Sequence, residues 1–259
     1  EPVKALAEMT DGMKPKPVIM YDAAHVLGLL GSYFQEPLLE GADIVTASTH
    51  KTFFGTQRGI IASNMDEGSD YFELWESIVK RTFPGSMSNH HLGTLLGLLM
   101  AAYEMNAYGH DYQRQVIANA KAFALALKGQ GLQVEGDPEV GYTQTHQVVL
   151  RVGYARGMEV ADRLERSNII VNYQALYDDE AFTTSSGLRM GVQEMTRFGM
   201  EKEGFGELAE YVAAVILGEK NVSQKVSSFR SRFTEMQYCL SEEQARPLLG
   251  ELVDSLLKL

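Results

Sequence analysis

Cysteine is nearly absent from this sequence, because Cys239 is the only one among 259 residues. A single thiol excludes an intramolecular disulfide, and it cannot form a zinc cluster or a redox pair. We therefore expect a reducing, cytoplasmic setting. The adjacent pair His90 and His91 does not indicate a metal site, since neighbouring residues on a helix point about 100° apart and cannot easily share one ion.

An excess of positive charge and long apolar runs are also missing. The sequence holds 23 Lys and Arg against 34 Asp and Glu, which gives a formal net charge of −11. Without a basic stripe there is no surface that matches phosphates or anionic lipids, so we expect neither a nucleic-acid nor a membrane partner. The longest apolar stretches, such as residues 95–102, are too short to cross a bilayer.

What the sequence does contain is an alternation of strand and helix patterns. Apolar runs at residues 17–21 and 43–48 each stop at polar residues, as buried strands of a parallel sheet do, and residues 59–62 offer a third short strand. Alternating strands and helices predict an α/β fold. The helical patterns cover residues 70–80, 91–106 and 112–127.

Beyond the last of these helices, short strand patterns are interleaved with helices. This texture predicts a second, smaller α+β domain, so we place the domains at residues 1–111 and 112–259. The expected strands are 147–152, 168–171 and 188–190, and the expected helices are 158–166, 205–217 and two more after residue 221.

The sharpest chemical signal is the segment Ser48-Thr49-His50-Lys51-Thr52, directly after the second predicted strand. Open α/β sheets bind their ligands just beyond the carboxyl ends of their strands. A lysine at that place can be desolvated and act as a nucleophile toward a carbonyl. A lone lysine in a loop is more commonly a solvated side chain, so the hypothesis depends on what accompanies Lys51.

Asp22 accompanies Lys51, because it ends the neighbouring predicted strand and its carboxylate would reach the same sheet edge. His25 follows one helical turn later. A carboxylate held against a pyridine nitrogen keeps that ring protonated, and a protonated ring withdraws electrons from an attached carbanion. An acid at a strand end can equally be a helix cap. It is the combination of Asp22 and Lys51 that favours a cofactor site.

These segments resemble the central core of the serine hydroxymethyltransferase family. The likeness begins at Val18-Ile-Met-Tyr-Asp-Ala-Ala-His and continues in collinear order to Ser185-Ser-Gly-Leu-Arg-Met-Gly and Thr196-Arg-Phe-Gly. It implies part of the large domain of an aspartate-aminotransferase-like, pyridoxal-phosphate-dependent transferase, followed by a smaller α+β C-terminal domain. It also implies a homodimer or homotetramer that acts on an amino acid as its small-molecule substrate.

The resemblance assigns cofactor roles to residues near the predicted sheet edge. Lys51 would carry pyridoxal 5'-phosphate, and His50 beside it would be a second catalytic residue. Gly85 would lie in a loop that reaches the cofactor phosphate of the neighbouring subunit. The remaining cofactor-binding residues would be Asp22, His25 and Ser48.

Substrate roles fall on arginines. Arg189 matches the residue that binds the substrate α-carboxylate, a role that needs a planar, two-pronged donor. Arg58 matches a position that shapes the substrate site, and Arg197 matches a position with a structural role.

The family's usual reaction cleaves the Cα–Cβ bond of serine and moves the one-carbon unit to tetrahydrofolate. The segment after Asn172, where the family carries pterin-binding residues, is shorter here and reads Tyr173-Gln-Ala-Leu-Tyr-Asp-Asp. A folate-independent aldolase, a transaldolase or an α-methylserine-type hydroxymethyltransferase is therefore an alternative. Further departures from the family are Thr56-Gln57, Ile60 and Ser86-Met-Ser-Asn.

The sequence starts at Glu1 and reads as though it begins within a domain. The resemblance places the residue stacked on the cofactor ring, and most of the phosphate-binding loop, upstream of this point. A non-catalytic fragment or scaffold domain is therefore an alternative of another class.

Overall fold

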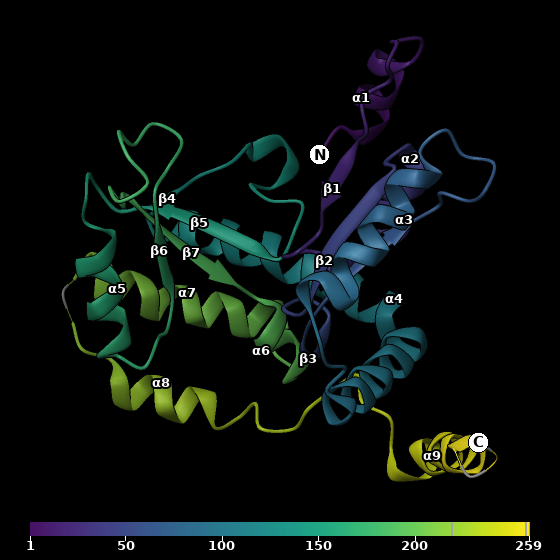
Figure 1. Ribbon diagram of the computed structural model, residues 1–259. Coiled ribbons are helices and arrows are strands. Elements are labelled where there is room, and N and C mark those ends of the chain that lie inside the picture. The colour runs from purple at the N-terminus through teal and green to yellow at the C-terminus, as the bar shows by residue number, and fades with distance from the viewer. Residues whose placement is uncertain (219, 257, 259) are drawn as a thin grey trace. The chain divides into compact units, whose positions relative to one another are not determined.

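The computed structural model describes residues 1–218, 220–256 and 258, and it divides the chain into two compact units. The units are Glu1–Tyr103 and Glu104–Leu259, drawn in purple to teal and in teal to yellow in Figure 1. The junction falls within helix α4 (Leu92–Gly129). The domain boundary at residues 111 and 112 lies in the same helix and stays a prediction.

The first unit contains a three-stranded sheet in the order β1-β2-β3. Strands β1 (Met20–Asp22) and β2 (Ile44–His50) are parallel, as the buried apolar runs predicted. Strand β3 (Phe54–Ser63) is longer than expected and antiparallel to β2. Only residues 51–53 separate β2 from β3, and so short a connection can join only antiparallel strands.

An apolar cluster lies beside this sheet. Tyr21 and Val45 from the strands are buried there together with Val3 of α1 (Val3–Thr10), a helix that the sequence patterns did not predict. Helix α1 contacts α2 (Pro37–Glu40), which begins at a proline and ends before Gly41 in the left-handed conformation. The other helical segments of this unit are η1 (Leu27–Leu29), α3 (Phe72–Lys80) and η2 (Arg81–Ser86).

The expectation of two helices at residues 91–106 and 112–127 was wrong, because α4 is one helix of 38 residues. The intervening residues 107–111 contain no proline, and Gly109 costs a helix interior only about 1 kcal/mol relative to alanine. A stripe at helical spacing is buried inside the second unit, and it compensates for this cost: Tyr112, Val116, Ala120, Phe123 and Leu127. No helix in the described part of the chain is both long and apolar enough to span a membrane.

The second unit contains an antiparallel sheet in the order β4-β5-β7-β6. Leu150 and Leu188 on one face are fully buried, and helices α5 and α7 contact each other and enclose this core. The strands are β4 (Gln133–Val134), β5 (Gln147–Arg151), β6 (Asn172–Gln174) and β7 (Gly187–Gly191). The helices are η3 (Pro138–Val140), α5 (Gly157–Glu165), α6 (Gln193–Arg197), α7 (Lys202–Ile216), α8 (Ser223–Arg230) and α9 (Glu242–Leu256).

The strand expected at residues 168–171 is displaced to β6. Asn168 adopts a left-handed conformation with φ 63°, and the N–H groups of Asn168 and Ile169 bond back to the last turn of α5. The apolar residues that follow α5 therefore close the helix, and Ile170 is 86% exposed. Pairing with β7 begins only at Asn172.

Asn119 joins three elements of the second unit through a fully buried side chain. Its amide Nδ2 donates to Thr196 Oγ1 at 2.9 Å and to the Met200 carbonyl at 2.8 Å, and its Oδ1 accepts from Gln115 at 2.9 Å. Asn119→Ala leaves these groups without partners, so we expect the free energy of unfolding to fall by about 1–3 kcal/mol. Urea denaturation measures this loss, and Gln130→Ala, at an exposed position after α4, should leave the free energy of unfolding unchanged.

Candidate active site

The segments that follow β1 and β2 meet at one edge of the first sheet. Thr52 is 1% exposed, and its hydroxyl donates to the His25 carbonyl at 2.8 Å and accepts from the Gly28 N–H at 3.1 Å. A Cβ on Gly28 would lie 2.2 Å from the carbonyl carbon of Thr52, so only glycine allows this approach. The two segments are thus held together next to Lys51.

Lys51 is half-buried, and its Nζ donates to Ser48 Oγ at 3.2 Å. Among the described residues no carboxylate contacts this amine, although acidic residues outnumber basic ones in the chain. The amine therefore lies beside the predicted cofactor-binding Ser48, with its charge uncompensated by an acid.

Asp22 lies at the carboxyl end of β1, opposite Thr46 of the parallel strand β2. Its Oδ1 accepts from the Ala24 N–H at 2.9 Å, a contact that orients the carboxylate and also caps the turn that follows. His25 comes next in that turn, half-buried, with its carbonyl on Thr52. The parallel register brings Asp22 and His25 to the sheet edge where Lys51 follows β2.

The register of β2 with β3 shifts between Ser48 and His50, where Thr49 alone lies opposite residues 55–58 of β3. Thr49 is 1% exposed, and its Oγ1 donates to the Thr56 carbonyl at 2.7 Å and accepts from the Arg58 N–H at 3.1 Å. The buried hydroxyl thus holds the irregular part of β3 against β2. His50 is exposed at the end of β2, immediately before Lys51.

Thr49 and Thr52 were missed as site residues by the sequence reasoning. Each lies next to one of the predicted catalytic residues His50 and Lys51, and each holds a backbone segment with a buried hydroxyl. The available signal was two threonines flanking that pair, which is weak because threonine is common in loops and strands.

Arg58 and Gly85 have contacts elsewhere in the first unit. The Arg58 guanidinium donates to Thr94 Oγ1 at 3.0 Å, to the His91 carbonyl at 2.8 Å and to the His90 carbonyl, so it holds the segment that leads into α4. Gly85 lies in η2, where a Cβ would be 3.0 Å from the Lys80 carbonyl oxygen. The substrate role of Arg58 and the cofactor role of Gly85 stay predictions.

Two predicted arginines belong to the second unit. Arg189 lies in the middle of β7, between Val149 of β5 and Asn172 of β6, and it is half-buried. The Arg189 side chain makes no hydrogen bond or ion pair within the described residues. Arg197 instead forms an ion pair of 2.7 Å with Glu104, and both side chains are at most 15% exposed. Its structural role stays a prediction, and this ion pair is compatible with it.

A comparison with known protein families decides what these residues belong to. The family model described as serine hydroxymethyltransferase matches residues 3–212. The chain belongs to the serine hydroxymethyltransferase family. This membership was predicted from the motifs around Asp22 and Lys51 and is confirmed.

Individual relatives agree with this result. The serine hydroxymethyltransferase of Archaeoglobus fulgidus is 44% identical over 252 residues, covering 95% of this chain and 55% of the relative. That of Pyrobaculum calidifontis is 41% identical over 259 residues, covering 98% of this chain and 58% of the relative. The chain thus spans little more than half the length of these serine hydroxymethyltransferases.

A solved structure shows the same fold. The crystal structure of L-threonine transaldolase from Pseudomonas fluorescens superposes with a TM-score of 0.82 at 30% sequence identity, and it covers 95% of this chain and 57% of that one. This likeness confirms the predicted fold, the α/β fold of pyridoxal-phosphate-dependent transferases.

The residues present fit the part of a pyridoxal-phosphate site that this chain would supply. The site needs an amine free to bond the cofactor's carbonyl carbon and an acid for the ring nitrogen. Lys51 offers an amine with no acidic partner among the described residues, and Asp22 offers a carboxylate at the neighbouring strand end. When bound, the cofactor supplies an electron sink for bond cleavage at the substrate Cα.

Thr52 offers a direct test of how Lys51 is held in place. Thr52→Val keeps the shape of the side chain but removes both hydrogen bonds between the two segments, leaving a buried carbonyl and a buried N–H unpaired. We expect the free energy of unfolding, measured by urea denaturation, to fall by about 1–3 kcal/mol. The same substitution at Thr10, whose hydroxyl bonds only to carbonyls of its own helix, should have a much smaller effect. Equal losses at the two positions would contradict the bridging role of Thr52.

Proposed function

We propose that this chain is part of a pyridoxal-phosphate-dependent enzyme that cleaves the Cα–Cβ bond of a β-hydroxy amino acid and transfers the one-carbon unit to tetrahydrofolate. The observation that carries this proposal is the position of Lys51. Its amine lies beside Ser48, without an acidic partner among the described residues, at the sheet edge where Asp22 ends the parallel neighbour. Membership of the serine hydroxymethyltransferase family supports reading this amine as the one that binds pyridoxal phosphate.

The roles of the side chains follow from their chemistry. Lys51 would hold the cofactor through its amine, which the substrate's own amine would displace, and the Ser48 hydroxyl at 3.2 Å orients the lysine. Asp22, fixed by the Ala24 N–H, would keep the cofactor's ring nitrogen protonated. His25 would neighbour the ring, and His50, whose side chain is exposed, would exchange a proton with the substrate.

Arg189 binds the substrate α-carboxylate in this proposal. A guanidinium matches a carboxylate with two parallel hydrogen bonds, and a binding arginine must keep those donors available. Arg189 does so among the described residues, whereas Arg197 is committed to Glu104. Arg58 shapes the substrate site through the segment that it holds before α4.

A transaldolase is the second candidate, and a specific observation favours it. One solved structure similar to this chain is named an L-threonine transaldolase, and the segment at residues 173–179 departs from the family's pterin-binding pattern. Transaldolases and hydroxymethyltransferases cleave the same bond and differ in the acceptor, so the roles of Lys51, Asp22 and Arg189 hold for both.

The whole protein would act on a small-molecule amino acid in the cytoplasm. It would be a homodimer or homotetramer, because Gly85 is assigned to the cofactor phosphate of a neighbouring subunit. The length matched in the relatives leaves a non-catalytic or scaffold role for the isolated chain as an alternative.

Covalent attachment of the cofactor tests the assignment of Lys51. The full gene product is loaded with pyridoxal phosphate, reduced with borohydride and digested, and the labelled peptide is identified by mass spectrometry. We expect the label on Lys51 and no stoichiometric label in Lys51→Ala, because the amine is the attachment point. Lys128→Ala, at an exposed helix end, should retain the label on Lys51. A label on another lysine in the unmodified protein would refute the proposal.

The acceptor is tested by following glycine formation from serine with and without tetrahydrofolate. A hydroxymethyltransferase should gain at least about tenfold in rate, since folate removes the one-carbon unit from the site. No response to folate, together with aldehyde exchange on threonine, would overturn the hydroxymethyltransferase proposal in favour of the transaldolase.

A further inference from the structure

One face of the second unit's sheet carries two arginines with opposite surroundings. Arg151 of β5 pairs with Gly187, and Val149 pairs with Arg189, so the two arginines are diagonal neighbours on one face. The buried residues Leu150 and Leu188 mark the opposite face. Guanidinium groups on diagonal neighbours are close enough to compete for the same anion.

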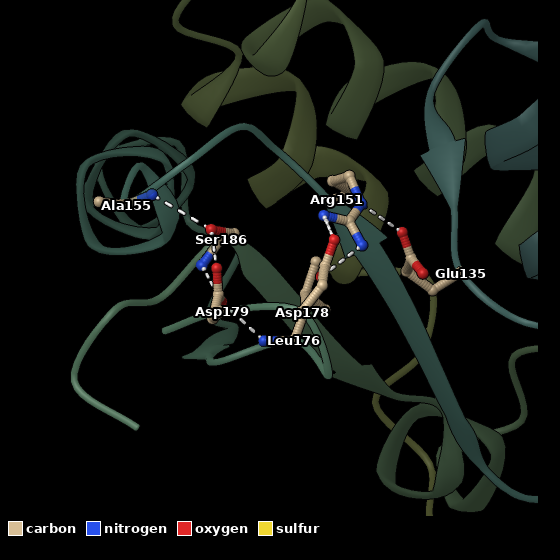
Figure 2. Close-up of polar contacts among 7 residues, drawn as sticks. All are labelled: Glu135, Arg151, Ala155, Leu176, Asp178, Asp179 and Ser186. Carbon is tan, nitrogen blue, oxygen red and sulfur yellow. Dashed lines mark hydrogen bonds and ion pairs between the residues drawn. The ribbon is translucent and has the colours of Figure 1, made fainter. Parts of the chain in front are cut away.

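Arg151 is fully engaged by acids. Its Nε donates to Glu135 Oε1 at 2.6 Å, and its Nη1 and Nη2 donate to the two oxygens of Asp178 at 3.0 and 2.9 Å. Figure 2 shows Arg151 between these two carboxylates. The hydrogen bond with Arg151 also lowers the pKa of Asp178 below its usual value, so the acid stays ionised and bound.

Glu135 would otherwise be within reach of Arg189. The Glu135 N–H bonds the Val149 carbonyl at 2.9 Å, which places Glu135 beside Val149, the residue opposite Arg189. Glu135 and Arg189 thus occupy one row across three strands. Neighbouring strands lie about 4.8 Å apart, so two long side chains can bridge such a row.

Asp178 belongs to the segment that connects β6 to β7. The next residue, Asp179, joins the two ends of that segment by hydrogen bonds. Asp179 Oδ2 accepts from the N–H groups of Leu176 and Ser186 at 2.7 and 3.0 Å, and its Oδ1 accepts from the Ser186 hydroxyl. Figure 2 shows this closure beside Arg151. The connection leads directly into β7, so Asp178 is held close to the strand that carries Arg189.

We propose that Arg151 is a positioning residue for substrate binding: by holding Glu135 and Asp178, it keeps both carboxylates away from Arg189 and leaves that guanidinium open to the substrate α-carboxylate. This inference rests on the proposed function of Arg189. Arg151 is not expected to touch the substrate. It acts by removing internal competitors from a face on which two acids and two cations lie together.

Steady-state kinetics of the full, cofactor-loaded gene product test this proposal. In Arg151→Met the released acids should capture Arg189 and raise KM for the amino acid roughly five- to tenfold, with little change in kcat, since a surface-type ion pair must be broken before substrate binds. Arg151→Lys keeps the positive charge but loses the two-pronged donor geometry of the guanidinium, and it should give a smaller rise in KM. Arg246→Met removes an exposed ion pair in α9 and should leave KM unchanged.

A triple variant separates charge capture from simple loosening of the β6–β7 connection. The variant that combines Arg151→Met with Glu135→Gln and Asp178→Asn also lacks the ion pairs that hold the β6–β7 connection. Because it has no competing carboxylates, its KM should return toward the wild-type value. Phenylglyoxal labelling of Arg189, mapped by mass spectrometry without turnover, should slow in Arg151→Met and recover in the triple variant. A KM that stays raised in the triple variant, or labelling that does not change, would overturn the proposal.

Arg189→Lys, measured in parallel, distinguishes this inference from the proposed function. A raised KM in Arg189→Lys with an unchanged KM in Arg151→Met would leave the carboxylate-binding role of Arg189 intact and refute the role of Arg151. An unchanged KM in Arg189→Lys would refute the role of Arg189 itself.

Discussion

The parallel pairing of β1 with β2 is the constraint on which the candidate active site depends. It brings the carboxyl ends of both strands to one edge, so that the segments after Asp22 and after His50 start side by side. Thr52 then joins these segments through its hydroxyl, and Gly28 permits the close approach that the two hydrogen bonds require. Segments that are 24 or more positions apart in the sequence are thereby hydrogen-bonded to each other, and Lys51 directly precedes the threonine that joins them.

The sequence was most informative where one physical signal dominated. Residues 43–48 place Ile44, Val45 and Ala47 between polar residues, a short pattern rich in β-branched residues that favours a buried strand, and β2 lies there. It was least informative where tertiary contacts override local preference. The apolar residues after Asn168 resemble a strand, but the left-handed Asn168 and the packing of Ile169 turn them into the end of α5. The prediction of a break inside α4 was wrong for a similar reason. Burial of one face of the helix outweighs the weak helix propensity of residues 107–111.

The sequence indicates candidate site residues more readily than the contacts that hold them. Lys51 and Asp22 are recognisable because few positions in a sheet suit a reactive amine and a carboxylate together. The hydrogen bonds of Thr49 and Thr52 have no comparable signature, since a threonine hydroxyl bonded to a backbone carbonyl leaves no pattern in the sequence. Such contacts depend on where the chain returns in space, and hydrophobic periodicity does not contain that information.

Arg151 and Arg189 show why residue type alone cannot assign a binding role. Both lie on strands of one sheet, face the same side and are half-buried. Their difference arises from partners that are distant in sequence: Glu135 from the start of the sheet and Asp178 from the connection before β7 both reach Arg151. A guanidinium already paired with two carboxylates has few N–H donors left for a third. One without an acidic partner among the described residues has all of its donors available for a substrate carboxylate. In the proposed mechanism, Arg151 is therefore as important for substrate recognition as Arg189, because its ion pairs with Glu135 and Asp178 leave Arg189 available.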